Sequence, residues 1–372
     1  MALTLIDSVP IDQVGGGTRT LSLYQGDITD MTAAQAVDFI CVSALPGDYS
    51  PTGGSVISAL AAKGVSVQSQ SQNKAANYEP TMPCWVSQNV ASAGLNFNQF
   101  ILFEPSNPSI TAGWDIGMIF QALSCYKGTA ATSIALPMVC TGSGGADFTM
   151  ILRELFFKGA NFGSRTAWPV SEVRLVVYSA AHAATATTQF ATMKAQYLNP
   201  PLAGGNTGTP PSGMTQRQYN CVKAYTGSAY YSVNTALRAN SLTDANFISY
   251  RATIELISAG LANLPNYSGL TARGANLPQS VINQYTVGAL ITHYSFTSTS
   301  WDRPWGGSCL LKINSATGKN VQAISYYPQE DEVLYDWRMT DTVTVVQGAG
   351  TEYGHSYSYR FTSNQTVPNW CG

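Results

Sequence analysis

The first half of the chain alternates short apolar runs with segments in which apolar residues recur at helical spacing. Strands are predicted within residues 36–45, 98–105, 133–145 and 172–180, and helices within residues 54–64, 114–128 and 147–160. Strands that alternate with helices typically build a mostly parallel sheet with helices on its faces. Residues 1–197 are therefore predicted to form an α/β domain of this mixed, mostly parallel kind. Its ligand crevice is expected beyond the carboxyl ends of the strands.

Polar and apolar positions follow a different order in the second half. Two helical stretches come first, at residues 217–238 and 244–264. Strand-like runs follow within residues 267–275, 287–300, 309–315, 321–327, 331–350 and 357–363. Helices that precede many strands favour an α+β architecture with an antiparallel β core. Residues 217–372 are therefore predicted to form a separate α+β domain.

A proline- and glycine-rich segment, residues 198–216, separates the two patterns. Its four prolines and several glycines stand among polar residues, which neither a helix nor a central strand tolerates well. We predict that this segment is a linker between two domains. A low-complexity surface loop within one domain is the alternative.

Charge is scarce along the whole chain. Charged residues make up 11% of the sequence, against roughly a quarter in an average soluble domain, and the formal net charge is −2. Such a balance offers no field for nucleic acid or an anionic membrane. No apolar run is long enough to span a bilayer, and the N-terminus lacks the basic and apolar regions of a signal peptide. We expect a protein that stays in the cytoplasm of its producer or is delivered to another cell without a conventional signal.

Cysteine and histidine are too scattered to suggest a metal centre. The seven cysteines include no Cys-x-x-Cys pair, and there are only three histidines. A zinc site or a dense disulfide framework is not expected, and most cysteines are predicted to be buried thiols.

Three adjacent carboxylates, Glu330, Asp331 and Glu332, stand out in a chain with so little charge. Two other short pieces precede them: Arg273 followed by Gly274 at the end of a strand-like run, and Ser-Thr-Ser at residues 298–300. Taken singly, the triplet predicts an exposed turn, the arginine a surface ion pair and the serine-threonine run a strand with a polar face. Their order along the chain is what carries information.

In this order the three pieces resemble the mono-ADP-ribosyltransferases related to cholera toxin and the clostridial actin-modifying toxins. The resemblance covers roughly residues 215–365, and the helical stretch "YTGSAYYSVNTALR" at residues 225–238 adds to it. It implies the α+β ADP-ribosyltransferase fold, NAD as substrate, no metal, and a target protein that supplies an acceptor arginine. It also implies a bacterial toxin or effector.

The resemblance implies a catalytic role for Glu332 and Glu330. Loss of nicotinamide from NAD leaves an oxocarbenium-like ribose, which a carboxylate at Glu332 would stabilise. Glu330, expected on the same side of an extended backbone, would meet the attacking guanidinium. Asp331 would then point to the opposite, solvated face. A Glu at the first position goes with arginine as the acceptor in this family.

The resemblance also implies the residues that bind NAD. Arg273 would hold the pyrophosphate or ribose and act with Ser298 in catalysis, and Gly274 would let the nicotinamide amide approach the backbone. Ser298 would position Glu332. The full set of NAD-binding residues is expected to be Arg273, Gly274, Ser298, Thr299, Ser300 and Glu332. Trp301 and Trp305 are further expected over the dinucleotide, and Tyr326 and Tyr327 in a substrate-recognition loop.

Glycine-rich pieces of the first half resemble a second family, the macro domains that bind ADP-ribose, over roughly residues 18–195. The pieces are "GDIT" at residues 26–29, "TGGSV" at residues 52–56 and "TGSGG" at residues 141–145. The resemblance implies that ADP-ribose, free or on a modified protein, is bound by Asp27, Ile28, Gly53, Gly54, Ser55, Val56, Thr141, Gly142, Ser143 and Gly144. Plain strand-to-helix turns are the alternative explanation for both glycine loops.

One departure from the macro pattern concerns catalysis. Many catalytic macro domains carry Asn-Ala-Ala-Asn after the second strand, whereas this chain has Val-Ser-Ala-Leu at residues 42–45. A binding module is therefore favoured, and a divergent ADP-ribosyl hydrolase stays open. Two alternatives to the transferase also stay open: an NAD glycohydrolase and a recognition protein without catalysis.

Overall fold

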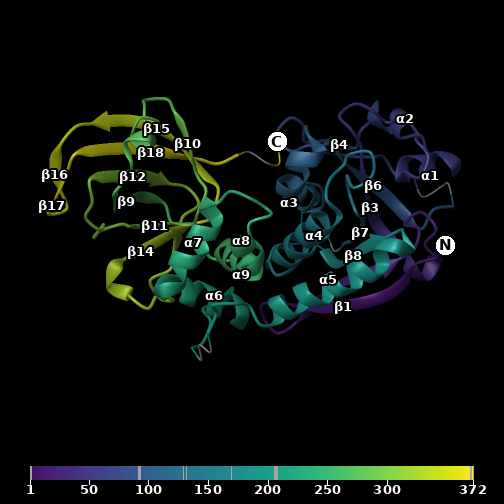
Figure 1. Cartoon of the computed structure of the whole chain (residues 1–372), viewed down its shortest axis with the longest axis horizontal. Helices are drawn as coiled ribbons and strands as arrows, with labels where there is room; N and C mark the ends of the chain where they lie inside the picture. The colour runs from purple at the N-terminus through teal and green to yellow at the C-terminus, as the bar shows by residue number, and fades with distance from the viewer. Residues whose placement is uncertain are drawn as a thin grey trace. The chain divides into compact units, whose positions relative to one another are not determined.

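The computed structural model describes residues 2–90, 94–128, 130, 132–168, 170–204, 208–368 and 371. The chain divides into two compact units (Figure 1). The first unit comprises Met1–Asn199 and Asn369–Gly372, and the second comprises Pro200–Pro368. The division falls inside the predicted linker, and residues 205–207 of that segment lie outside the described residues.

The first unit is built on an eight-stranded mixed sheet in the order β1-β2-β8-β7-β3-β6-β5-β4. Its strands are β1 (Thr4–Asp12), β2 (Thr18–Gln25), β3 (Val37–Ser43), β4 (Ala76–Asn77), β5 (Cys84–Val86), β6 (Phe97–Phe103), β7 (Thr132–Pro137) and β8 (Val170–Val177). The five strands from β2 to β6 in this order run parallel, and the pairs at both edges are antiparallel. The prediction of a mostly parallel α/β sheet is confirmed.

Helices cover both faces of this sheet. They are α1 (Val56–Ala62), α2 (Val67–Ser71), α3 (Pro108–Lys127), α4 (Phe148–Gly163) and α5 (Ala180–Leu198), with a 3₁₀ turn η1 at Ala33–Gln35. The central strand β3 is apolar on both sides: Ile40 and Val42 pack in a core with Leu60 of α1, while Phe39 and Cys41 alternate with them and are equally buried. Helices α3, α4 and α5 lie side by side in chain order, because α4 contacts both α3 and α5. Continuous apolar sequence in β3 thus reflects burial on two faces.

The apolar pattern did not predict helix α5. Its sequence is rich in Ala and Thr, and only four of its side chains are fully buried: Ala186, Phe190, Met193 and Tyr197. The helix begins where the Ser179 hydroxyl accepts a hydrogen bond from the Ala181 N–H. A sparse apolar stripe of this kind is weak as a signal, although its spacing is helical.

The second unit places helices before a largely antiparallel sheet, as predicted. The helices are α6 (Gln216–Ala224), the π-helical turn η3 (Tyr225–Ala229), α7 (Tyr230–Arg238), α8 (Ala245–Ser249), α9 (Arg251–Ala262) and α10 (Gln279–Ile282). The strands are β9 (Gly269–Ala275), β10 (Leu290–His293), β11 (Thr297–Ser300), β12 (Cys309–Ser315), β13 (Lys319–Asn320), β14 (Glu332–Tyr335), β15 (Met339–Gln347) and β18 (Tyr359–Thr366). Their order is β10-β15-β18-β12-β9-β11-β14-β13, and only β12 and β18 pair in parallel. A separate hairpin joins β16 (Gly350–Glu352) to β17 (His355–Tyr357).

Two sequence predictions in the second unit were wrong. The predicted strand at residues 321–327 is a series of turns that leads into the 3₁₀ turn η4 (Pro328–Glu330). The Asn320 side chain accepts the Gln322 N–H and starts this turn, while Val321 and Ile324 supply the apolar signal because they are buried. The predicted continuous helix at residues 217–238 is interrupted at Gly227, whose φ and ψ are −92° and −110°.

No helix of the described residues is long and apolar enough to cross a membrane.

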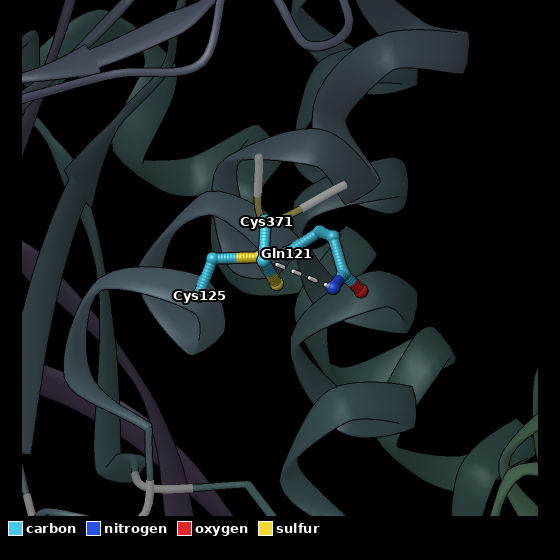
Figure 2. The surroundings of a disulfide bond; sticks show 3 residues. All are labelled: Gln121, Cys125 and Cys371. Atoms are coloured by element: carbon cyan, nitrogen blue, oxygen red, sulfur yellow. Dashed lines mark hydrogen bonds between the residues drawn. A yellow bond between two sulfur atoms is a disulfide. The ribbon is translucent and has the colours of Figure 1, made fainter. Parts of the chain in front are cut away.

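A disulfide joins Cys125 of α3 to Cys371, and both residues belong to the first unit (Figure 2). The two cysteines are 246 positions apart in sequence, and their Cα atoms are 5.1 Å apart. The Gln121 side chain lies against the Cys125 sulfur, with Nε2 at 3.7 Å. The sequence did not predict this pairing, because connectivity does not follow from spacing in a scattered set. The other five cysteines are buried and free, as expected for most of them: Cys41, Cys84, Cys140, Cys221 and Cys309.

This arrangement predicts the pattern of thiol reactivity. Burial raises the pKa of Cys41 and Cys84 well above the usual value, and it raises the pKa of Cys140 to about 11. Thiolate is the reactive form, so native protein should incorporate essentially no iodoacetamide near neutral pH. Mass spectrometry without reductant should recover a peptide in which Cys125 is linked to Cys371. Alkylation of Cys371 in the native, unreduced protein would contradict the disulfide.

Candidate active site

Strand pairing in the second unit brings distant sequence pieces to one pocket. β11 lies between β9 and β14, and Ser300 of β11 pairs with both Ala272 and Glu332. The pocket at this place has a volume of about 730 Å³. Its lining includes four residues with predicted catalytic roles, Arg273, Ser298, Glu330 and Glu332, together with Gly274. The structure thus gathers residues that are up to 59 positions apart in sequence (332 − 273).

The closest polar contact in this pocket joins Ser298 to Glu332. The Ser298 hydroxyl donates to the Glu332 Oε1 atom at 2.5 Å, and the Glu332 side chain is 4% exposed. Burial raises the pKa of Glu332 to about 7, and the negative charge of Glu330 adds to the rise. The Ser298 hydrogen bond and the positive charge of Arg273 act in the opposite direction. Glu332 is therefore a carboxyl that exchanges its proton near neutral pH.

Arg273 supplies positive charge to the same pocket. Its Nε atom is buried and has no hydrogen-bond partner within the described part of the chain. Burial lowers the pKa of this guanidinium from its usual value. Arg238, at the end of α7, also lines the pocket and is exposed. Two guanidinium groups that face one cavity suit a ligand with several anionic oxygens.

The backbone between the two glutamates is not extended, so the predicted reason for their common side was wrong. Glu330 ends the 3₁₀ turn η4, and Asp331 adopts a left-handed conformation with φ 53° and ψ 45°. This turn still leaves Glu330 in the pocket lining. Asp331 is not simply solvated either, because its Oδ1 atom accepts a hydrogen bond from Gln322 Nε2 at 2.9 Å.

Thr299 and Ser300 were expected to contact NAD, but neither lines the pocket, and both side chains are fully buried. Thr299 Oγ1 donates to the Val333 carbonyl at 2.9 Å. The Ser300 hydroxyl accepts from the backbone N–H groups of Asp302 and Arg303. Both hydroxyls therefore hold β11 and the turn that follows it in place.

Gly274 is required by the fold of the chain itself. A Cβ atom at this position would lie 1.8 Å from the Trp305 carbonyl oxygen, so no side chain fits. Trp305 in turn lines the pocket, as expected for an aromatic residue over a dinucleotide. Trp301 does not line it: its ring stacks on Tyr267 with centroids 5.8 Å apart.

Several pocket residues come from the helical stretch at residues 225–238 and were not named individually from sequence. The Asn234 side chain donates to the Tyr225 hydroxyl at 2.9 Å, and this hydroxyl donates to the Phe296 carbonyl at 3.3 Å. Burial raises the pKa of Tyr225, which stays protonated. Tyr230 and Tyr231 add exposed rings at the pocket. The motif marked this stretch but did not indicate which of its side chains face the pocket.

The first unit carries a second candidate site at the carboxyl ends of its parallel strands. Two pockets of about 320 Å³ and 250 Å³ share six lining residues and so form one crevice: Gly54, Ser55, Val56, Pro137, Val176 and Tyr178. Of the expected ADP-ribose-binding residues, the first pocket is lined by Gly54, Ser55, Val56, Thr141, Gly142, Ser143 and Gly144, and the second by Asp27, Ile28, Gly54, Ser55 and Val56. Gly53 lines neither pocket.

Asp27 provides the one carboxylate among the described residues that line this crevice. Its Oδ1 atom accepts from both the N–H and the hydroxyl of Thr29, each at 2.8 Å. This local turn fixes the carboxylate at the crevice. Asp27 is only partly buried, whereas the Ile28 side chain is almost completely buried.

The glycine loops of the crevice have specific backbone needs. Gly54 has φ +78°, after which Ser55 caps α1 by accepting the Ser58 N–H. At the other loop, a Cβ atom on Gly144 would lie 2.6 Å from the Cys140 carbonyl. Cys140 itself has φ +61°, and its N–H donates to the Ser43 hydroxyl. One loop thus caps helix α1, and the other is tied to Ser43 at the end of β3.

Sequence reasoning missed an aromatic rim on this crevice. Tyr178 follows β8 and is 70% exposed, and the rings of Phe148 and His182 stack with centroids 4.5 Å apart. The sequence pattern did not mark these residues, because they lie in or just before the first turns of α4 and α5 and outside the buried apolar stripes of these helices.

Comparison with known proteins concerns mainly the second unit. Residues 187–357 match the family model described as ADP-ribosyltransferase exoenzyme. This match begins within α5 and leaves most of the first unit outside it.

Two curated relatives share part of the chain. Mav of Mycobacterium avium (strain 104), named as a candidate NAD(+)–arginine ADP-ribosyltransferase, is 38% identical over 117 residues, which is 30% of this chain and 14% of that protein. Tre1 of Serratia proteamaculans (strain 568), named NAD(+)–protein-arginine ADP-ribosyltransferase, is 30% identical over 123 residues, which is 33% of this chain and 27% of that protein. The chain spans about a quarter or less of the length of these relatives. The matches support a transferase.

A solved structure is also similar. The type III effector XopAI from Xanthomonas axonopodis pv. citri, in an N-terminally truncated form, is 20% identical with a TM-score of 0.36, over 58% of this chain and 88% of that one.

Among the described residues, no group of three His, Cys, Asp or Glu is placed to hold a metal ion.

The buried carboxyl of Glu332 predicts how stability depends on pH. The folded protein keeps Glu332 protonated up to about pH 7, whereas the usual value for a glutamate is 4.5, so the folded state binds more protons between these values. Wild-type stability should therefore fall as pH rises through this window. Glu332→Gln removes the effect, and its free energy of unfolding relative to wild type should increase with pH by up to about 1.4 kcal/mol per unit of pKa difference. Urea denaturation across the window measures it.

Two further substitutions should shift the Glu332 pKa in opposite directions. Glu330→Gln removes a nearby negative charge and should lower it, and Ser298→Ala removes a hydrogen bond to the carboxylate and should raise it. Carbon-detected NMR of the labelled side chain reads the titration. An unchanged titration of Glu332 in both variants would show that the two neighbours do not act on it.

Proposed function

We propose that the second unit is an NAD-dependent protein-arginine mono-ADP-ribosyltransferase and that the first unit binds ADP-ribosyl groups. The observation that carries the transferase is one pocket lined by Glu332 with its Ser298 hydrogen bond, by Glu330 and by an incompletely paired Arg273. The family match and the names of the two curated relatives support it. Because these relatives are bacterial, we further propose a bacterial toxin or effector that acts inside a target cell.

The first step of the proposed reaction breaks the bond between nicotinamide and ribose. Arg273 and Arg238 hold the anionic pyrophosphate of NAD, and the pocket volume of about 730 Å³ accommodates a bound dinucleotide. Nicotinamide departs with the electron pair of the C1′–N bond, and positive charge develops on the ribose. Ionised Glu332 stabilises this charge and accepts a hydrogen bond from the ribose 2′-hydroxyl.

The second step joins the ribose to the acceptor. Glu330 pairs with a guanidinium of the target protein and directs one nitrogen to C1′. A new C1′–N bond forms, and the proton lost by the guanidinium passes to Glu330. Glu330 suits this role because its turn places it in the pocket lining yet only partly buried.

Two alternatives use the same pocket. In an NAD glycohydrolase, water replaces the guanidinium, and in a recognition protein NAD binds without cleavage. The second glutamate favours the transferase over both, since ribose stabilisation alone requires only Glu332. Agmatine distinguishes the three: a transferase releases more nicotinamide when it is present, a glycohydrolase releases nicotinamide without it, and a recognition protein releases none.

Geometry supports binding rather than hydrolysis in the first unit. The crevice offers backbone loops, a fixed Asp27 carboxylate and aromatic rings, which suit an adenine, a diphosphate and a ribose. At the position where catalytic macro domains carry asparagines, Val42 is fully buried and Leu45 is an exposed apolar residue. We therefore propose a macro-like module that holds ADP-ribose or an ADP-ribosylated protein, with a divergent hydrolase as the alternative.

Glu330→Gln and Glu332→Gln should separate the two steps. Glu332→Gln should lower both nicotinamide release and labelling of arginine acceptors by about 100-fold or more, because charge stabilisation is lost. Glu330→Gln should lower labelling by a similar factor and keep nicotinamide release within a few-fold. Labelled NAD with agmatine, followed by chromatography of both products, measures each rate. Full labelling by Glu330→Gln would exclude a role for Glu330 in acceptor positioning.

Asp27→Asn tests the crevice of the first unit. The variant keeps an oxygen for Thr29 but turns an amide NH₂ toward a ligand donor such as an adenine amino group. Titration calorimetry should show ADP-ribose affinity about 10-fold lower or worse, equivalent to about 1.4 kcal/mol. Asp7→Asn, which alters a carboxylate paired with Lys194 and outside the crevice lining, is the control and should bind as wild type does. No binding by wild type would remove the proposal for this unit.

A further inference from the structure

The hairpin formed by β16 and β17 supplies no group to the proposed reaction (Figure 1). It is a two-stranded sheet, separate from the eight-stranded sheet of the second unit. Glu352 and His355 pair across its turn, and the two turn residues, Tyr353 and Gly354, have φ angles of 51° and 78°. Two positive φ angles in a two-residue turn are typical of a tight hairpin. A contact that fixes Glu352 therefore also fixes the position of His355.

Ion pairs of Glu352 tie this hairpin to the main sheet. Its carboxylate accepts from Lys312 Nζ of β12 at 3.0 Å and from Arg360 Nη1 of β18 at 2.9 Å. The three side chains are at most 25% exposed, so solvent screens these ion pairs only in part. Burial alone would raise the pKa of Glu352, but the hydrogen bonds from Lys312 and Arg360 outweigh it, and the pKa is lowered. Glu352 is therefore a carboxylate at neutral pH, held by two strands of the sheet.

The hairpin also contacts the segment that carries Trp305. A Cβ atom on Gly306 would lie 3.1 Å from the His355 Nδ1 atom, so the His355 ring lies against the backbone of this segment. The Ser358 N–H, just after β17, donates to the Ser308 carbonyl at 2.8 Å. The hairpin thus contacts the segment on both sides of residue 307.

The same segment packs closely on β9, next to Arg273. A Cβ atom on Gly274 would lie 1.8 Å from the Trp305 carbonyl oxygen, and one on Gly307 would lie 2.6 Å from the Ala275 nitrogen. Trp305 itself lines the candidate active site. Close packing on β9 and contact with His355 leave the segment little room to move. The place of the hairpin therefore affects where Trp305 lies in the pocket wall.

We propose that the β16–β17 hairpin positions the Trp305 segment for the binding of NAD and that Glu352 is the positioning residue. The inference rests on the proposed NAD site. Glu352 does not line the pocket, so it acts through His355 and the backbone at Gly306. A wall that is ordered in advance loses less conformational entropy when the dinucleotide binds. Loss of the tie weakens NAD binding and leaves the groups that break its bond in place.

Glu352→Gln tests the tie with little change of shape, because it removes the charge that pairs with Lys312 and Arg360. With agmatine in excess, KM for NAD should rise about 5-fold or more while kcat for nicotinamide release stays within about twofold. His355→Ala leaves the ion pairs intact and should give the same result. A variant that is merely less stable contains fewer active molecules, which lowers kcat and leaves KM unchanged.

A matched control changes the same two strands away from the hairpin. Asn314→Ala removes the hydrogen bond from Asn314 Nδ2 of β12 to Asn364 Oδ1 of β18, 2.7 Å long, and should keep the wild-type KM. Hydrogen exchange followed by mass spectrometry reads the segment directly. Exchange of residues 301–308 should become faster in Glu352→Gln and His355→Ala and stay unchanged in Asn314→Ala.

An unchanged KM in both Glu352→Gln and His355→Ala would overturn the inference, and so would a lower kcat without a higher KM. A higher KM with unchanged exchange of residues 301–308 would also overturn it, because the effect would not pass through this segment. If wild type releases no nicotinamide, the transferase fails as a separate result, and titration calorimetry with NAD decides the inference. Glu352→Gln should then bind NAD about 5-fold more weakly than wild type does, and equal affinities or no binding by wild type would overturn it.

Discussion

The buried carboxyl of Glu332 is the constraint around which the second unit is arranged. Glu332 stands on β14 at 4% exposure, and its nearest support is the Ser298 hydroxyl on the neighbouring strand β11. A carboxylate away from water is costly unless it is hydrogen-bonded or protonated, and one hydroxyl does not offset that cost fully. The rise of its pKa to about 7 is the visible consequence. The register of β11 and β14 therefore sets both the place and the protonation of the central group.

Close backbone approach is the second condition for this pocket. Gly274 permits the Trp305 carbonyl to lie where a side chain would be, and Gly227 permits Tyr326 to pack on the helix interruption. Neither glycine has a φ in the left-handed region. The need for glycine at both positions therefore comes from the close approach of neighbouring atoms and not from conformational freedom. Gly144 in the first unit follows the same rule with the Cys140 carbonyl. In both units, these glycines therefore allow the chain to pack closely on itself beside a candidate site.

The sequence predicted the elements with strong periodicity, and it named several residues that the structure brings together in one pocket. Strand β3 and helix α4 were found because their apolar patterns are dense, and the Arg273, Ser298 and Glu332 set was found because it recurs in order in a known family. The turns at residues 321–331 were not predicted. Val321 and Ile324 are buried within these turns, and their apolar side chains give a strand-like signal. Helix α5 and the Cys125–Cys371 disulfide were missed for the opposite reason: a sparse stripe and a distant partner leave little local signal. Such features depend on contacts between residues that are distant in sequence, which local sequence patterns do not reveal.

Charge balance supports the proposal that this pocket binds NAD. Among the described residues, the buried Nε atom of Arg273 has no hydrogen-bond partner, and burial raises the pKa of Glu332 more than the attraction of Arg273 lowers it. Each group is left with part of its electrostatic cost uncompensated. A dinucleotide carries an anionic pyrophosphate and a cationic pyridinium ring, so one molecule offsets both costs in a single binding event. In the proposed complex, the positive charge of the pyridinium ring beside Glu332 would lower the pKa of this carboxyl and favour the ionised form that the proposed cleavage needs. The substrate would then supply the opposite charges that Arg273 and Glu332 lack in the protein alone.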